Sequence, residues 1–308
     1  MLGIIRSAFG MRRASGPPPV AMNDSVETVR RQIEAAGGVI ASVDGVDAGC
    51  LLLGFEPDQV LTISRVSVLA AHQHQGLAAA MARAAGEYGA DLGCRRVELM
   101  ARADFPELVR WWQLHGFSVD RDVPGGFIMA ASLPVSVTVP TPDDMRRLGV
   151  LLAAHLRAGD LLVANGELGA GKTTLTQGLG EGLKVDGPVI SPTFVLARNH
   201  HSTVGGPDLV HVDAYRMGSA AELEDIDLDS SMADSVTLVE WGAGLAEGLA
   251  PDRLDIDIVR SADPADDTRV VYLRGRGPRW DDDDLYSLRE QFPHESAPTM
   301  TSQVEETQ

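Results

Sequence analysis

The sequence predicts an α/β protein of two domains, an α+β domain followed by an α/β domain with buried parallel strands, and then an acidic tail. Length is the first observation, because 308 residues are about twice the roughly 150 residues of a common domain. The second is the run SLPVSVTVPTP at 132–142, whose three prolines no helix can cross. The third is the change at this run from short strands with tight turns to apolar strands alternating with helices.

The first domain is expected to span 23–133, after an incomplete segment and loop at 1–22. We hypothesise that the natural start lies upstream, so that the domain as written lacks its first strand. Apolar residues at helical spacing predict a helix over 25–36 that stops at Gly37 and Gly38. The elements expected after it are three antiparallel strands (39–43, 50–55 and 60–68), a helix (76–91), a strand (95–101), a helix (105–115) and a strand (126–132).

The second domain is expected to span 134–279. It begins with a helix over 142–157 that carries two aspartates in its first turn, followed by the strand LLVAN at 161–165. A glycine-rich loop and another helix come next, and then the strands 208–213, 235–241 and 253–259. The tail, 280–308, holds eight acidic residues against Arg289 alone, so we expect it to be solvated and mostly disordered.

Charge and composition exclude several classes of protein. The 26 basic and 44 acidic residues give a net charge of −18, which argues against a broad electrostatic grip on nucleic acid. Cys50 and Cys94 lie inside apolar runs and indicate neither a disulfide framework nor a thiolate metal site. Because no stretch approaches the roughly 20 apolar residues of a membrane span, we expect a cytoplasmic protein with no membrane partner.

A phosphate-binding loop is the strongest motif. The segment Gly166–Thr173 satisfies G-x-x-x-x-G-K-[ST] between a strand and a helix. Backbone N–H groups of such a loop turn toward phosphates, while Lys172 neutralises their oxygens and Thr173 can bind Mg²⁺. The predicted ATP-binding residues are Glu167, Leu168, Gly169, Ala170, Gly171, Lys172, Thr173 and Thr174.

Two acids end neighbouring strands of this domain. Asp213 closes DLVHVD and Glu240 closes TLVE, so both should project into the crevice at the carboxyl ends of the sheet. Either acid can hold Mg²⁺ through water or orient a hydrolytic water.

Five motifs in order carry a family resemblance: GELGAGKTT at 166–174, SPTF at 191–194, HVDAYR at 211–216, LEDIDL at 223–228 and VEW at 239–241. Together they resemble the TsaE family over about 137–259. The resemblance implies a bacterial ATPase that binds ATP and Mg²⁺ and supports formation of N6-threonylcarbamoyladenosine at position 37 of tRNAs reading ANN codons. It also implies TsaD-type and TsaB-type protein partners, with tRNA held indirectly through their complex.

The resemblance implies a role for individual residues. The catalytic set is Lys172, Asp213 and Glu240, the metal ligands are Thr173 and Glu240, and the switch-like hydroxyls are Ser191 and Thr193. Trp241 is expected to brace the nucleotide or a partner surface. We expect His211 to be a packed or hydrogen-bonded neighbour of Asp213, because Mg²⁺ prefers oxygen ligands.

The first domain carries a weaker signal. Gln73–Ala78 forms a Gln-x-x-Gly-x-Ala turn at a helix start, and WWQLHGF follows at 111–117. With the preceding strands, these segments resemble the GNAT N-acetyltransferase family over about 23–133. The resemblance implies acetyl-coenzyme A binding by the backbone of Gln75, Gly76, Leu77 and Ala78.

The acid–base residues of this family are not obvious here. Where members often carry Asn and Tyr, this sequence has Phe105 and Trp112, and an indole N–H is only a hydrogen-bond donor. Asp104, Glu98 and His115 remain as candidates. An active acetyltransferase and an inert module therefore both stay open. Two alternatives for the whole chain also stay open: a kinase that phosphorylates a small molecule with the same phosphate loop, and an ATP-dependent assembly factor whose GNAT module is inert.

Overall fold

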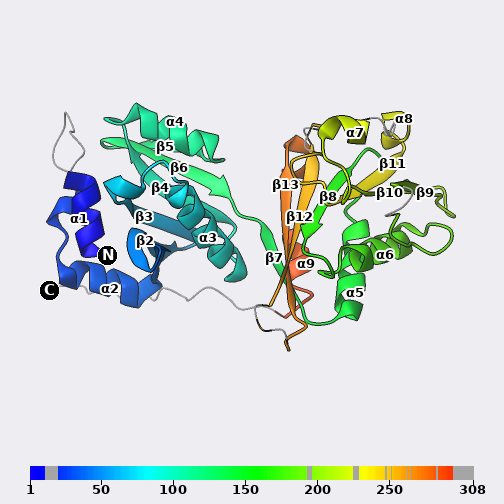
Figure 1. The fold of residues 1–308 in the computed structure, drawn as a ribbon, viewed down its shortest axis with the longest axis horizontal. Helices are drawn as coiled ribbons and strands as arrows, with labels where there is room; N and C mark the ends of the chain where they lie inside the picture. The colour runs from blue at the N-terminus through cyan, green and yellow to red at the C-terminus, as the bar shows by residue number, and fades with distance from the viewer. Residues whose placement is uncertain are drawn as a thin grey trace. The chain divides into compact units, whose positions relative to one another are not determined.

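The computed structural model describes residues 1–10, 20–192, 196–224, 229–246, 248–250, 252–261, 263, 265–281 and 284–293. These residues divide into two compact units, one ending at Leu133 and the other beginning at Pro134, and each unit is considered by itself (Figure 1). None of the helices in the described part of the chain combines the length and apolar character needed to cross a bilayer.

The first unit is built on a mixed sheet with the strand order β1-β2-β3-β4-β6-β5. Its strands are β1 (Gly38–Val43), β2 (Val46–Glu56), β3 (Val60–Val68), β4 (Arg96–Arg102), β5 (Ser118–Val123) and β6 (Gly126–Ser132). Its helices are α1 (Leu2–Gly10), α2 (Val26–Ala36), α3 (Leu77–Asp91) and α4 (Pro106–Leu114), with short 3₁₀ turns η1 (Val20–Asn23) and η2 (Ala70–His72). The predicted antiparallel meander β1-β2-β3 is confirmed.

Strand β5 was not predicted. It pairs with β6 at the edge of the sheet, and all of its residues except Val123 are exposed. Its sequence, SVDRDV, lacks the alternation of apolar and polar residues by which a half-buried strand is recognised, and for this reason the strand was not expected.

Strands β3 and β4 separate along their length. They are parallel and pair only where Val60–Thr62 faces Arg96–Glu98. Beyond this point β3 bulges, because Arg65 and Val66 together lie opposite Leu51 of β2. Arg65 adopts a left-handed φ of 55°, which a side chain other than glycine rarely takes.

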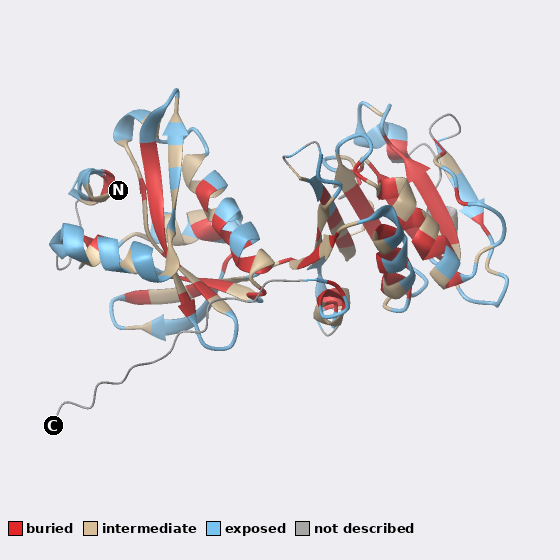
Figure 2. Cartoon of the chain, turned by 90° about the horizontal axis from the view of Figure 1, so that it is seen from below, coloured by how far each residue is buried: buried red, intermediate tan, exposed pale blue. Residues whose placement is uncertain are grey.

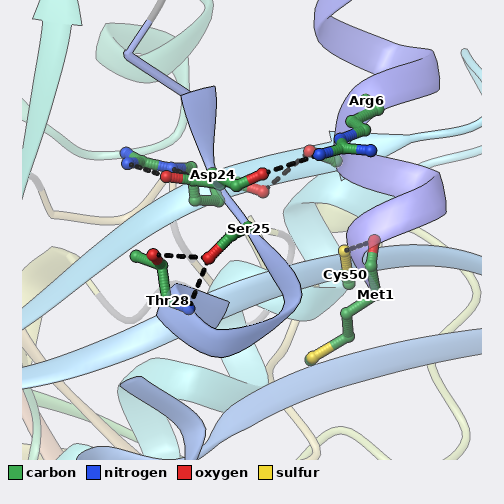
Figure 3. A network of polar contacts seen from close by, with 8 residues as sticks. Met1, Arg6, Asp24, Ser25, Thr28 and Cys50 are labelled. Atoms are coloured by element: carbon green, nitrogen blue, oxygen red, sulfur yellow. Dashed lines mark hydrogen bonds and ion pairs between the residues drawn. The ribbon is translucent and has the colours of Figure 1, made fainter. Parts of the chain in front are cut away.

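An ion pair holds the bulge in place. Arg65 Nε lies 2.6 Å from Asp24 Oδ2, and Arg6 Nη2 of α1 donates to the Asp24 carbonyl at 3.0 Å (Figure 3). Ser25 caps α2 by accepting a hydrogen bond from the Thr28 N–H at 3.1 Å. The first turn of α2, helix α1 and the bulge of β3 are therefore tied together at Asp24.

Residues 2–10 are helical and pack on the sheet. Ile4, Ile5 and Ala8 of α1 are buried, and the two isoleucines share a core with Cys50 and Leu52 of β2. The apolar residues of this segment thus contribute to the first unit. The hypothesis of a start farther upstream stays a prediction.

The second unit contains a sheet with the order β7-β13-β12-β8-β11-β10-β9. Its strands are β7 (Val135–Val139), β8 (Leu161–Gly166), β9 (Ala197–His200), β10 (Asp208–Asp213), β11 (Ser235–Glu240), β12 (Arg253–Arg260) and β13 (Arg269–Arg276). Its helices are α5 (Pro142–Ala153), α6 (Lys172–Leu183), α7 (Ala220–Glu224), α8 (Asp229–Met232) and α9 (Tyr286–Arg289), with the 3₁₀ turn η3 (Pro278–Trp280). The predicted parallel core is confirmed, because β12, β8, β11 and β10 are parallel neighbours.

The central strands of this sheet are buried on both faces (Figure 2). Helices α5 and α6 pack against each other, and their apolar residues join the core on one face, while a smaller cluster around Val212 and Val239 covers the other. Helix α5 begins as predicted, with Thr141 as its cap and Pro142 in its first turn, but it ends at Ala153 rather than Arg157.

The prediction of a solvated tail from residue 280 onward is wrong for its first part. Trp280, Leu285, Leu288 and Phe292 are buried in the main core of the second unit. Arg289 is 2% exposed, and its Nη1 donates to the carbonyl of Ser136 in β7 at 2.8 Å. The acid-rich composition conceals these apolar side chains, whose spacing of three to five residues places them on one side of the segment. Residues 294–308 lie outside the described part.

Candidate functional site

A cavity of about 690 Å³ opens where β3 and β4 diverge in the first unit. Gly76, Leu77 and Ala78 line it from the start of α3, and Trp111 and Trp112 line it from α4. Gly76 adopts a left-handed φ of 79° as the residue before α3, so the chain turns there to point helix N–H groups at the cavity. Gln75, the fourth residue predicted for this cradle, is not among the lining residues and instead donates its amide to the Ala71 carbonyl at 3.4 Å.

The acid–base candidates of the first unit differ in their surroundings. His115 lines the cavity, with its ring stacked on Trp111 and its Nδ1 2.7 Å from the Trp111 carbonyl oxygen. Glu98 is instead engaged by Arg96 and Arg121, at 2.7 and 2.9 Å. Asp104 forms an ion pair with Arg102, which itself lines the cavity.

The glycine-rich loop of the second unit connects β8 to α6. Gly166, Gly169 and Gly171 have φ angles of 146°, 77° and 113°, which disfavour any residue with a Cβ. At Gly166 a Cβ would also come within 2.6 Å of the Ile258 carbonyl oxygen. The loop therefore depends on these glycines. It places the N-terminal end of α6, with its N–H groups, at the carboxyl end of β8.

Lys172 is folded back onto this loop. Its Nζ donates to the carbonyls of Gly166 and Glu167, at 2.7 and 3.1 Å, and lies 3.7 Å from the centroid of the Trp241 ring. Burial lowers the pKa of Lys172, while Glu240 and Asp213 act in the opposite direction. The ammonium thus has partners that phosphate oxygens can replace.

Glu240 lies beside the start of α6. It is 3% exposed, and its Oε1 and Oε2 are 2.9 and 3.3 Å from the Thr173 hydroxyl. His211 Nε2 lies 2.8 Å from the same Oε1. His211 therefore bonds to Glu240 and not to Asp213. The register of the parallel strands sets Glu240 opposite Asp213, two residues beyond His211 along β10.

Asp213 is the cross-strand partner of Glu240 and is also buried, at 5% exposure. Its carboxylate accepts hydrogen bonds from the Ser191 hydroxyl at 2.9 Å and from the Tyr215 N–H at 3.0 Å. The site thus unites Asp213 with Ser191 from the predicted switch-like pair. Thr193 lies outside the described residues.

The comparisons with known proteins agree with this geometry. Residues 139–270 match the family model of threonylcarbamoyl adenosine biosynthesis protein TsaE. A TsaE protein of Streptomyces coelicolor is 60% identical over 138 residues, which cover 44% of this chain and 93% of that protein. The chain belongs to the TsaE family.

Residues 10–117 match the model of the acetyltransferase (GNAT) family, so the first unit carries a GNAT domain. Among solved structures, Bacillus subtilis YdiB is 32% identical, with a TM-score of 0.41 and coverage of 51% of this chain and 92% of that chain. An N-acetyltransferase of Thermoplasma acidophilum in complex with coenzyme A is 15% identical, with a TM-score of 0.35 and coverage of 42% and 89%.

The second unit contains the residues that match TsaE and is called the TsaE-family unit. It offers hard oxygen donors suited to Mg²⁺. They are the Glu240 carboxylate and the Thr173 hydroxyl, which already face each other. No cluster of three or more His, Cys, Asp or Glu side chains suited to a metal occurs among the described residues. The donor set therefore fits a magnesium ion that takes its remaining ligands from phosphate oxygens and water, as Mg²⁺ commonly does.

Two features of the TsaE-family site were missed in the sequence. One is the bond from His211 to Glu240, and the other is Tyr215, whose ring lies 5.1 Å from that of Trp241 and whose N–H binds Asp213. Both residues stand in the motif HVDAYR, so their presence was visible, but the register that determines their partners was not.

Proposed function

We propose that the TsaE-family unit is a Mg²⁺-dependent ATPase required to form the threonylcarbamoyl group on N6 of adenosine 37 in tRNAs reading ANN codons. It would act in the cytoplasm with TsaD-type and TsaB-type partners. The observation that carries the proposal is the juxtaposition of Lys172, Thr173 and Glu240 at one glycine-rich loop. The names of the matching relatives supply the biosynthetic context.

The residues divide the work of ATP binding and hydrolysis. The N–H groups from Glu167 to Thr174 bind phosphate oxygens, and Lys172 exchanges its two carbonyl partners for the β- and γ-phosphates. Thr173 and Glu240 would hold Mg²⁺, which neutralises charge on the phosphates. Asp213 orients the attacking water, and its bond to Ser191 connects that carboxylate to the predicted switch-like segment.

The charge of the chain favours indirect contact with tRNA. A net charge of −18 opposes binding to a phosphate backbone, which requires basic side chains. The partner proteins would therefore hold the tRNA, while this chain supplies ATP turnover.

The deciding experiment measures ATP hydrolysis and modified tRNA in the same reaction. The purified full chain is assayed with Mg²⁺ alone and then with TsaD-type and TsaB-type partners. We expect slow hydrolysis alone, and partner-dependent turnover together with threonylcarbamoyladenosine. Turnover that is indifferent to the partners, without modified tRNA, would overturn the proposal and favour a small-molecule kinase.

For the GNAT domain, we propose binding of acetyl-coenzyme A in the 690 Å³ cavity, with the pyrophosphate at the start of α3. The cavity and the left-handed Gly76 favour this assignment. Titration calorimetry of the full chain with acetyl-coenzyme A tests it, and Ala78→Glu, which brings a carboxylate to the cradle, should abolish binding. If wild type fails to bind, the inert module is favoured instead.

A further inference from the structure

His211 is a fully buried imidazole next to the proposed magnesium site. It lies in β10, between β9 and β11, with 0% of its surface exposed. Its Nε2 is 2.8 Å from Glu240 Oε1, and Glu240 is itself 3% exposed. A hydrogen bond between two groups so shielded from water restricts both side chains.

The surroundings of the other ring nitrogen indicate the direction of this bond. His211 Nδ1 is buried and has no hydrogen-bond partner in the described residues. An imidazolium would bury a second N–H there without an acceptor, which is costly. We therefore assign the neutral tautomer with its proton on Nε2, so that His211 donates to the Glu240 carboxylate.

The two donors to Glu240 come from different parts of the fold. Thr173 belongs to the first turn of α6, which receives the nucleotide, whereas His211 belongs to β10, the strand between β11 and β9. Thr173 reaches both carboxylate oxygens, but His211 reaches only Oε1. The strand therefore anchors Oε1, which is also the oxygen nearer to the Thr173 hydroxyl, and leaves Oε2 without a contact from His211.

We propose that His211 is a positioning residue for Mg²⁺: it fixes the Glu240 carboxylate so that its other oxygen faces the cation site before nucleotide arrives. The inference rests on the proposed ATPase function. Loss of a group that orients a metal-binding carboxylate typically weakens metal affinity about 10- to 100-fold. The same loss should leave metal-free nucleotide binding intact, because His211 is not part of the phosphate loop.

The test compares three variants of the full chain. His211→Phe removes the donor, His211→Asn retains an amide too short to reach Glu240, and His211→Gln can restore the donor. His200→Phe is the control, because His200 is also a buried histidine with a ring nitrogen that lacks a partner. It lies on neighbouring β9, near enough to interact electrostatically with His211, but it is not hydrogen-bonded to Glu240.

The readouts are the Mg²⁺ concentration for half-maximal ATP hydrolysis and the affinity for a fluorescent ADP analogue in EDTA. We expect His211→Phe and His211→Asn to raise the Mg²⁺ requirement about tenfold or more. His211→Gln should recover most of this loss, and all variants should bind the analogue in EDTA as wild type does. Asn keeps a polar side chain in the core, so the test remains decisive if the Phe variant does not fold.

Three outcomes are distinguishable. Unchanged Mg²⁺ dependence in His211→Asn overturns the inference. An equal change in His200→Phe also overturns it, because the effect would then reflect a general disturbance of the core. Absence of Mg²⁺-dependent hydrolysis in wild type refutes the proposed function itself rather than the role of His211.

Discussion

The Lys172 ammonium lies 3.7 Å from the centroid of the Trp241 ring. Trp241 holds this position with a left-handed φ of 61°, a conformation that costs a residue other than glycine about 1 kcal/mol or more. Its backbone N–H donates to the Ala164 carbonyl at 2.9 Å, and Tyr215 packs against its ring. The surrounding structure therefore maintains a strained backbone that places an aromatic face beside the charge of the phosphate loop.

Trp241 should report nucleotide binding through its fluorescence. If the Lys172 ammonium moves from the Trp241 ring to phosphate oxygens, the electric field at the indole changes. Addition of ADP should therefore alter the fluorescence emission of the wild-type protein. Trp241→Phe should lose most of this change while retaining a ring for the cation. Trp111→Phe, in the other unit, is the control and should respond as wild type does. A full response in Trp241→Phe would show that the nucleotide does not disturb this contact.

Lys172 and Glu240 should affect different steps. Lys172→Ala removes the charge that binds phosphate oxygens, so nucleotide affinity should fall at least about 100-fold. Glu240→Gln keeps the shape of the side chain but removes its negative charge, so nucleotide binding in EDTA should persist while Mg²⁺-dependent hydrolysis is lost. Binding is measured with a fluorescent ADP analogue and turnover by phosphate release. Normal hydrolysis by Glu240→Gln would disprove the metal role of this acid.

Leu288 should stabilise the TsaE-family unit although it follows an acid-rich stretch. It is 1% exposed in the main core, so Leu288→Ala should lower the free energy of unfolding by about 3 kcal/mol. Val204→Ala, at a residue 61% exposed, should change it by less than about 0.5 kcal/mol. Calorimetry measures both effects in the unfolding transition of the TsaE-family unit, which is recognised because added ADP shifts it. An equally small effect of the two substitutions would mean that α9 contributes little to the core.

Local chemistry made much of this fold predictable. The glycine spacing of 166–173 predicts a loop that needs positive φ angles, and the observed φ angles confirm it. The apolar runs of β8, β10 and β11 indicate strands that are buried on both faces. Composition averaged over a long segment is a poorer guide to which residues are buried. The acids at 281–284 dominate the composition of the tail, although Leu288 and Phe292 follow within a few residues and are buried.

Contacts between distant segments could not be predicted in this way. The bond from His211 to Glu240 depends on the register of β10 against β11, and 29 residues separate the two side chains in sequence. Likewise, β7 pairs with β13, which lies more than 100 residues later in the chain. A short run such as VSVTV between prolines carries no sign of that partner. These relationships arise from the packing of the whole unit.

Cys50 should make the first unit sensitive to alkaline pH. Burial raises the pKa of its thiol from 9.0 to about 11, with Asp47 adding to the effect and the N-terminal ammonium opposing it. The Sγ lies 3.8 Å from the Met1 carbonyl oxygen, under α1 (Figure 3). Because the folded pKa is higher than the unfolded one, this contribution to stability is complete below about pH 9 and is lost as the pH rises through about 11.

Unfolding of wild type and Cys50→Ala by urea at pH 8 and pH 10.5 measures this dependence. Wild type should lose more stability than the variant over this interval. At pH 10.5 the thiol of Cys50 ionises in the unfolded state but stays protonated in the folded state, and this favours unfolding; Cys50→Ala has no thiol to ionise. Iodoacetamide at pH 8 provides an independent check, because the thiolate is the reactive form. We expect no labelling of Cys50 until urea unfolds the unit, and rapid labelling of the native protein would contradict the raised pKa.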